Sequence, residues 1–155
     1  MGTMYAITFE GVTVTAAQDF FEIQPADDKP VVIHAIYLSQ SSDAGDSQEE
    51  LLRIKIIRGH TTSGSGGTTA TPRPLDPNSP SAGMTAEVNN TTIASGGTAV
   101  DLHADTFNVR SGWVYMPTPE ARPKVNQGNT TLVVRLMAAP ADSLTMSGTL
   151  VVEEL

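Results

Sequence analysis

The sequence predicts an all-β fold, a single antiparallel β-sandwich of the jelly-roll or Greek-key type with long loops. Apolar residues recur with a period of two along most segments, which is the pattern of half-buried strands. Gly, Pro and Asn separate these segments, and helical periodicity is almost absent. Two long crossings, Thr61–Pro80 and Pro117–Asn129, favour a jelly roll or Greek key, because a meander needs only tight hairpins.

The first predicted strands lie close together in the chain. Met4–Phe9 and Val12–Val14 flank a Glu-Gly turn, and Asp19–Ile23 is a mostly apolar segment that ends just before a proline. Val31–Leu38 is apolar on both faces except at His34, which is typical of a central strand. We therefore expect His34 to be a core histidine with a hydrogen-bond partner.

The middle of the chain has a weaker pattern. Met84–Val88 and Thr98–Leu102 are short strand candidates between Asn-Asn and Gly-Gly turn signals. Thr106–Met116 reads as one longer strand whose aromatic residues share a face if no bulge intervenes. Gly112 inside it suggests a bulge or a close approach of two backbones, which would shift that register.

The cleanest alternation lies in Leu51–Ile57, Thr131–Ala138 and Leu144–Val152. Each predicts a strand with one apolar face, and the last strand closes the sandwich. The residues predicted to point inward are Leu52, Ile54, Ile56, Leu132, Val134, Leu136, Leu144, Met146, Leu150 and Val152, and those predicted to point outward are Arg53, Lys55, Thr131, Arg135, Thr145, Ser147 and Thr149. Leu132, Val134, Leu136, Leu150 and Val152 are expected at the centre of the core.

Thr61–Pro80 consists largely of Thr, Ser, Gly and Pro. Such a segment buries too little apolar surface to offset the entropy of its own ordering, so it predicts a long loop without a role in the core. Its prolines stiffen it and lower the entropy lost on docking. We expect it to be mobile in the free protein and ordered against a neighbouring subunit, with Pro72, Arg73 and Pro74 among the contacts.

Two features precede the strand at Leu51. Ser47–Leu52 carries a capping-box pattern that allows at most one helical turn. Asp43–Asp46 could bind calcium loosely, although acidic surface loops more often hold only water.

Size and charge limit the classes of function. The 155 residues fit a single domain, 1–155, and the net charge of −8 argues against nucleic-acid binding, which requires a basic patch. The nine basic residues do not cluster, so an anionic membrane surface is not an expected partner. Cysteine is absent, which excludes disulfides and thiol chemistry. No basic region followed by an apolar run is visible at the beginning, and we expect a protein assembled in a cytoplasm.

Asp101, His103 and Asp105 are the candidate metal ligands. Residues two apart on a strand share a face, so these three side chains could converge on a divalent cation. The alternative is a solvated strand edge with an exposed histidine, which we favour because a metal site generally needs a further ligand. No other pattern of catalytic residues stands out, and neither an enzyme activity nor a cofactor is expected.

Trp113 and Tyr115 allow two interpretations. Exposed, they would anchor a partner or a sugar ring, since aromatic residues dominate binding hot spots. Buried, they would be a core pair on one strand, which is the interpretation we favour. Arg122 is a further candidate for a contact with an acidic neighbour.

The segments SGWVYMPTPEARPKV (Ser111–Val125) and DSLTMSGTLVVEEL (Asp142–Leu155) carry a resemblance. Together with the acidic, cysteine-free sandwich pattern, they resemble the small jelly-roll decoration or cement proteins of tailed-bacteriophage capsids. The resemblance covers the whole chain in architecture and composition. It implies a non-enzymatic virion protein that sits on the capsid surface as a homotrimer and clamps neighbouring subunits of the major capsid protein.

Two other functions remain open at this point. A carbohydrate-binding or receptor-binding β-sandwich of a phage tail fibre would use the same fold and present aromatic residues to sugars. A cupin-like enzyme would also use it, but the His-x-His core of metal-dependent cupins is missing.

Overall fold

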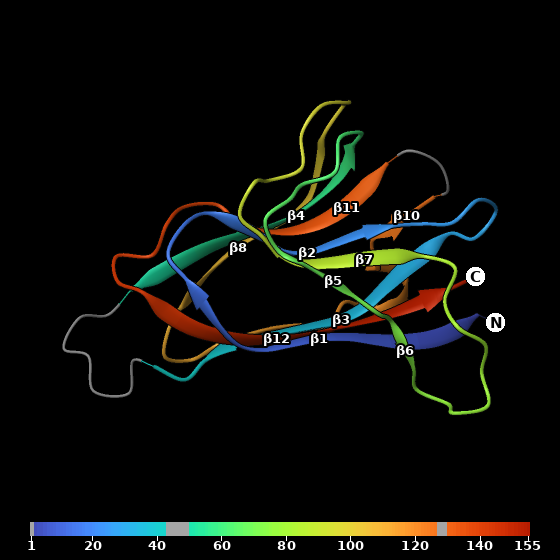
Figure 1. Cartoon of the computed structure of the whole chain (residues 1–155), viewed down its shortest axis with the longest axis horizontal. Helices are drawn as coiled ribbons and strands as arrows, with labels where there is room; N and C mark the ends of the chain where they lie inside the picture. Colours follow the sequence, from blue (N-terminus) through green and yellow to red (C-terminus); the bar gives the residue numbers. More distant parts are fainter. Residues whose placement is uncertain (1, 43–49, 127–129) are drawn as a thin grey trace.

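The computed structural model describes residues 2–42, 50–126 and 130–155, which form two antiparallel β-sheets packed face to face (Figure 1). The strands are β1 (Thr3–Val14), β2 (Gln18–Gln24), β3 (Val31–Gln40), β4 (Leu51–His60), β5 (Thr68–Ala70), β6 (Arg73–Pro74), β7 (Thr85–Asn90), β8 (Val100–Asn108), β9 (Trp113–Tyr115), β10 (Lys124–Val125), β11 (Thr131–Leu136) and β12 (Leu144–Glu154). One short 3-10 helix, Pro119–Ala121, lies in the crossing between β9 and β10.

The strand order is that of a jelly roll. Sheet A runs β10-β3-β12-β1-β6, with β9 also paired to β3, and sheet B runs β5-β7-β2-β11-β4-β8. Successive strands from β1 to β4 alternate between the two sheets, and β11 and β12 do the same. The main strands therefore form the quartets β1-β12-β3-β9 and β2-β11-β4-β8, the arrangement that two interlocked Greek keys produce. The all-β sandwich prediction is confirmed.

The core lies between the sheets where sequence alternation predicted it. Leu132, Val134, Leu136, Leu150 and Val152 are all buried. The antiparallel register of β11 with β4 and of β12 with β3 points these side chains at one another across the sandwich. Burial of this continuous apolar set is the main force that holds the two sheets together.

Thr106–Met116 is not a single strand. β8 ends at Asn108 in sheet B, and β9 begins at Trp113 in sheet A. Gly112 permits the crossing, because its φ of +69° is left-handed and a Cβ there would lie 2.9 Å from the Leu38 carbonyl oxygen. The close backbone approach expected at Gly112 is confirmed, and it separates two strands instead of bending one.

The expectation that Thr61–Pro80 is one long loop is wrong, because parts of it form edge strands. Its residues include β5, which pairs with β7 at the edge of sheet B, and β6, which pairs with β1 at the edge of sheet A. Residues 61–66 also bridge residues 91–97, through Thr62 with Ser95 and Ser65 with Thr92. Backbone pairing gives this Thr- and Gly-rich segment the hydrogen bonds that its side chains cannot supply.

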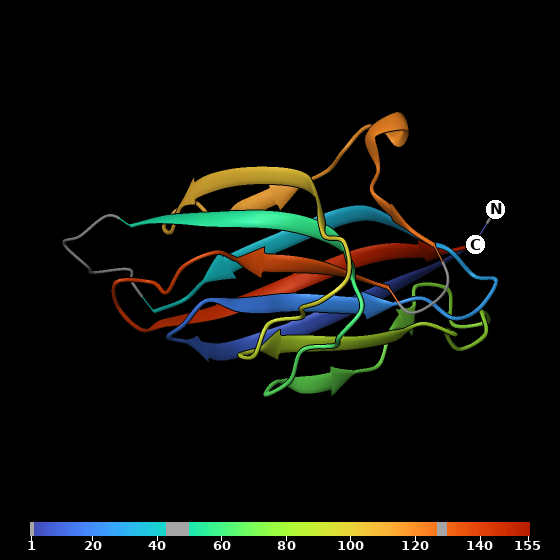
Figure 2. The ribbon, with the colours of Figure 1, turned by 90° about the horizontal axis from the view of Figure 1, so that it is seen from above.

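Residues 61–66 and 91–97, here called the flap, lie across the outer surface of sheet B. Figure 2, viewed from above, shows these green and yellow segments side by side over the strands of that sheet. Gly64 is required by this close packing, since a Cβ there would lie 2.4 Å from the Thr92 carbonyl oxygen. The flap gives sheet B a covering layer that the alternation pattern did not reveal.

Because of the flap, β11 is buried on both faces. Thr131 and Arg135 point away from the main core, as predicted, but they are buried, with exposed fractions of 2% and 8%. Ile57, Val133 and Ala94 form a small second apolar cluster beneath the flap.

The remaining structural predictions concern the segment before β4 and the possibility of a membrane span. The one-turn helix at Ser47–Leu52 and the loose calcium loop at Asp43–Asp46 lie outside the described residues, except for the last residues of the former. Within the described ranges, no helix has the length and apolar character needed to cross a membrane.

Candidate functional site

The proposed metal ligands Asp101, His103 and Asp105 do not converge. A β-bulge between β4 and β8 pairs Ile56 with His103 but Ile57 with Asp101, so Asp101 and His103 face opposite sides of sheet B. Asp101 Oδ2 instead accepts a hydrogen bond from Lys55 Nζ at 2.7 Å on the outer side. No group of three His, Cys, Asp or Glu side chains able to hold a metal ion occurs among residues 2–42, 50–126 and 130–155.

His103 and Asp105 belong to an aromatic cluster at the edge of the sandwich. Trp113 Nε1 donates to Asp105 Oδ2 at 3.0 Å, and the His103 ring centroid lies 4.5 Å from that of Tyr115. The pKa of Asp105 is lowered, chiefly by the indole N–H of Trp113 and by the backbone N–H of Thr106. Burial raises the pKa of Tyr115.

Trp113 is a core residue, with 5% of its surface exposed and its ring stacked 5.7 Å from Tyr115. Tyr115 is half-buried against the same core. The arrangement agrees with the core interpretation of the pair, and Trp113 offers no surface to a partner.

The other residues predicted to bind a partner do not form one surface. Pro72 is buried, while Arg73 and Pro74 make up β6 beside β1. Arg122 follows the 3-10 helix that leads to β10, at the opposite edge of sheet A. Within the described part of the chain its Nε is buried without a hydrogen-bond partner. A surface that included all of these residues would have to wrap around the sheet.

The outer face of sheet A carries mostly small, hydroxyl-bearing and apolar side chains along its central strands, with Glu10 at the bulge of β1 and Arg73 of β6 beside Ala6. β1, β12, β3 and β9 line up Thr8 with Thr149, Thr149 with Tyr37, and Tyr37 with Val114. Its small, hydroxyl-bearing and apolar members are Ala6, Thr8, Ala35, Tyr37, Ser39, Val114, Met116, Ser147, Thr149 and Val151. Sequence analysis missed this face, because each of its residues reads singly as the ordinary exposed side of a strand.

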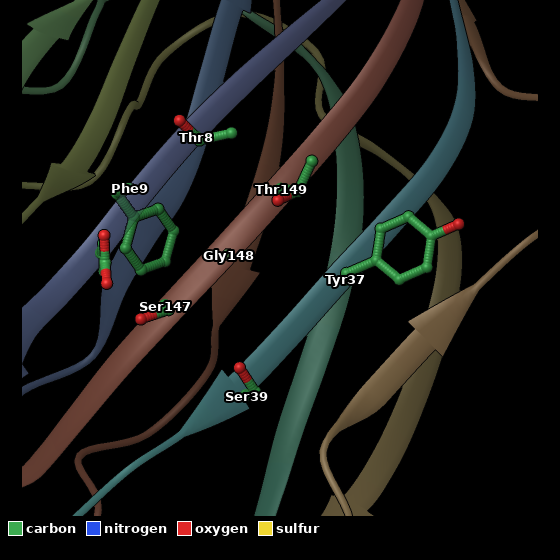
Figure 3. A pocket seen from close by; sticks show the side chains of 8 residues that line it. Thr8, Phe9, Tyr37, Ser39, Ser147, Gly148 and Thr149 are labelled. Carbon is green, nitrogen blue, oxygen red and sulfur yellow. The ribbon is translucent and has the colours of Figure 1, made fainter.

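A shallow groove of about 410 Å³ crosses this face (Figure 3). Hydroxyl groups of Thr8, Ser39, Ser147 and Thr149 surround it, Tyr37 borders it, and the Glu10 carboxylate lies at its β1 side, so three strands contribute side chains to one hollow. Val114 and Met116 lie beyond Tyr37 with 62% and 66% of their surface exposed. Tyr37 contacts Met116, the hydroxyl lying 3.6 Å from the sulfur.

His34 lies at one end of this face. The expectation of a core position is wrong, because a bulge between β3 and β12 leaves His34 as the extra residue and turns its half-buried ring outward. The expected partner exists: Nε2 lies 2.8 Å from Glu153 Oε2. The backbone N–H of Gly2 and then His34 hold the pKa of Glu153 below its usual range.

Beneath the flap lies a buried polar cluster that sequence analysis also missed. Arg135 Nε donates to Asp19 Oδ1 at 2.6 Å, and Arg135 Nη2 donates to the Ala94 carbonyl oxygen at 2.9 Å. The backbone N–H of Ala94 donates to Asp19 Oδ2 at 2.8 Å. His60 completes the group, with Nδ1 3.1 Å from the Gly96 carbonyl oxygen and Nε2 3.4 Å from Arg135 Nη1. These contacts fix residues 94–96 of the flap to sheet B.

A second set of contacts fixes the other half of the flap. Glu22 Oε1 accepts from the backbone N–H of Gly64 at 2.8 Å, and Glu22 Oε2 lies 2.5 Å from the Ser63 hydroxyl oxygen. Glu87, the cross-strand neighbour of Glu22, lies 2.9 Å from the same hydroxyl oxygen. Burial raises the pKa of Glu22 against the opposing effect of these hydrogen bonds. In the sequence, the sign of these two polar clusters is a charged residue within a mostly apolar segment: Asp19 and Glu22 in β2, and Arg135 in β11.

A scan against protein-family models matched no family, and searches of curated proteins and of solved structures found no match. The functional assignment therefore depends on the surfaces of this chain. Its buried polar residues hold the fold together, and its outer sheet A face is suited to binding by contact.

Proposed function

We propose that the protein is a non-enzymatic structural protein of a virus particle, which decorates a bacteriophage capsid and cements neighbouring subunits of the major capsid protein. The observation that carries the proposal is the outer face of sheet A, whose central strands present mainly uncharged side chains in a molecule whose net charge is −8.

Charge placement supports contact through this face. The acidic residues nearest to it are Glu10, at the bulge of β1, and Glu153, which is paired with His34. A protein partner centred on Tyr37 and Val114 can leave Glu10 and Arg73 at the solvated rim of the contact, where interfaces usually place charged residues. Tyr37, Val114 and Met116 supply the aromatic and apolar contacts that interface cores favour.

The remaining surface suits a protein that is added to an assembled shell. An acidic surface keeps the free protein soluble before it attaches. If several copies associate as a trimer, weak contacts made in register add to a stable attachment through avidity.

Binding to capsids of the phage that encodes this protein tests the proposal. Val114→Glu places a charge on the exposed apolar part of the proposed contact surface, on β9 beside Tyr37, and we expect it to weaken co-sedimentation with capsids at least tenfold. Leu51→Glu is the matched control, because Leu51 is equally exposed, at 68%, but lies at the start of β4 in sheet B. Melting temperatures of both variants verify folding. Failure of the unaltered protein to bind capsids would contradict the proposal.

The groove beside Tyr37 favours one alternative, a carbohydrate-binding or receptor-binding sandwich of a tail fibre. An exposed tyrosine next to a row of hydroxyl groups can stack on a sugar ring and hydrogen-bond to it. Calorimetry with bacterial surface glycans distinguishes the two functions. Glycan binding that is lost in Tyr37→Ala, together with no capsid binding, would favour the alternative.

A further inference from the structure

The two halves of the flap are attached to sheet B by different chemistry. Ala94 is held by Asp19 and Arg135, whose opposite charges compensate each other, and Gly96 is contacted by His60. Residues 63 and 64 are held by Glu22, with Glu87 beside it on β7. No cation contacts this second pair in the described structure, and Asn90, which donates to Glu87 Oε2 at 3.1 Å, is neutral.

The single hydroxyl proton of Ser63 cannot be donated to both Glu22 and Glu87. A hydroxyl group donates one proton, yet the Ser63 oxygen lies within hydrogen-bonding distance of a carboxylate oxygen from each glutamate. If both glutamates were ionised, one of these contacts would place two acceptors together without a hydrogen. If Glu22 carries a proton, Glu22 Oε2–H donates to Ser63 Oγ, and Ser63 Oγ–H donates to Glu87 Oε1. All three groups are then satisfied.

The charges around Glu22 favour that protonated form. Glu22 is only 3% exposed, and the negative charges of Glu87 and Asp19 add to the effect of its burial in raising its pKa. Arg135 on β11 is committed to Asp19 and Ala94, and His60 at the end of β4 contacts Arg135 and Gly96. The residue of β11 that pairs with Glu22 is Val133, which is apolar.

We propose that Glu22, Ser63 and Glu87 form a proton-dependent latch, which closes the flap over sheet B when Glu22 is protonated and loosens it when Glu22 ionises. Ionisation releases the proton to solvent and leaves two carboxylates facing one hydroxyl group. The repulsion falls on residues 63–64, at the half of the flap that lacks a compensating arginine.

The direction of the pH dependence follows from linkage. A carboxyl group that binds its proton more tightly in the folded state stabilises that state below its unfolded pKa. The contribution is lost as the pH rises through the higher pKa of the folded state. The latch is therefore closed at acidic pH and weakens toward neutral and alkaline pH.

Two measurements on the full chain test the latch. Carbon-13 NMR of the Glu22 carboxyl group in the unaltered protein should give a titration midpoint above the ordinary glutamate value, and Glu87→Gln should move that midpoint down by removing the neighbouring charge. Hydrogen exchange of the Gly64 amide, corrected for its intrinsic pH dependence, should accelerate as Glu22 ionises.

Glu22→Gln supplies the decisive comparison. Its amide group can donate to Ser63 and accept from Gly64 at every pH, so we expect Gly64 protection to become independent of pH. Glu10→Gln is the control, with an exposed glutamate of the same kind, and should keep the pH dependence of the unaltered protein. An ordinary Glu22 midpoint, or an unchanged pH dependence in Glu22→Gln, would overturn the proposal.

Discussion

Arg135 is the residue whose environment differs most from the one its strand pattern suggests. It is 8% exposed and bonded to Asp19, which is fully buried. Removing one member of a buried ion pair leaves the other charge without compensation, which is more costly than the net worth of the pair.

We therefore expect Arg135→Ala to lower the free energy of unfolding by about 3–5 kcal/mol. Arg53→Ala on the neighbouring strand β4 is the control, because Arg53 is exposed, and its effect should stay within about 0.5 kcal/mol. Chemical denaturation at neutral pH measures both. Equal, small losses would mean that the Asp19–Arg135 pair does not hold the flap.

Leu136 and Thr149 provide a second comparison at the residue scale. Leu136 is fully buried in the core, and we expect Leu136→Ala to cost about 2–5 kcal/mol through lost burial and the cavity left behind. Thr149 lies on the outer face of sheet A, so Thr149→Ala should cost much less. Comparable shifts in thermal melting would contradict the strand register.

Residue patterns predicted the main core correctly, because period-two alternation depends only on the strand itself. They missed the burial of Arg135 and the separation of Asp101 from His103. The first depends on a flap that comes from a distant segment, and the second on a bulge that inverts the face of a strand. Neither cause lies within the local sequence of the affected strand.

At the scale of elements, the segment between β4 and β8 is the main departure from a plain jelly roll. It adds β5, β6 and β7 to the sheet edges and places the flap over sheet B. Its Thr- and Gly-rich composition correctly indicated a low apolar content, but it wrongly predicted a long loop without strands. Backbone pairing and buried carboxylates, which composition does not display, order it.

Deleting Ser63–Thr71 is expected to lower the melting temperature by several degrees. The deletion removes β5 together with the backbone N–H of Gly64, and it leaves the buried Glu22 without its hydrogen-bond donors. Differential scanning calorimetry measures the change. A melting temperature equal to that of the unaltered protein would contradict this expectation and favour the original prediction of a long loop without a role in the core.

At the scale of the whole molecule, the open edges of the sandwich bear on assembly. β8 ends sheet B and β9 lies on the matching edge of sheet A, and neither strand contains a lysine that would discourage edge pairing. The expected assembly is a homotrimer joined sandwich edge to sandwich edge. Light scattering on the purified protein and imaging of the assembled target test it, and a monomer in both settings would refute it.

The proposed role in a capsid depends on which surface meets the partner. The mainly uncharged central strands on the outer face of sheet A, in a molecule of net charge −8, favour this face as the one that is covered in the proposed assembly. This orientation distinguishes cementing through sheet A from attachment through an edge or a loop.

Electron cryo-microscopy of capsids of the phage that encodes this protein tests the proposed role most directly. We expect copies of this jelly roll on the capsid surface where neighbouring capsid subunits meet, with Tyr37, Val114 and Met116 in contact with those subunits. A capsid surface without this protein, or one on which the outer face of sheet A points into solvent, would contradict it.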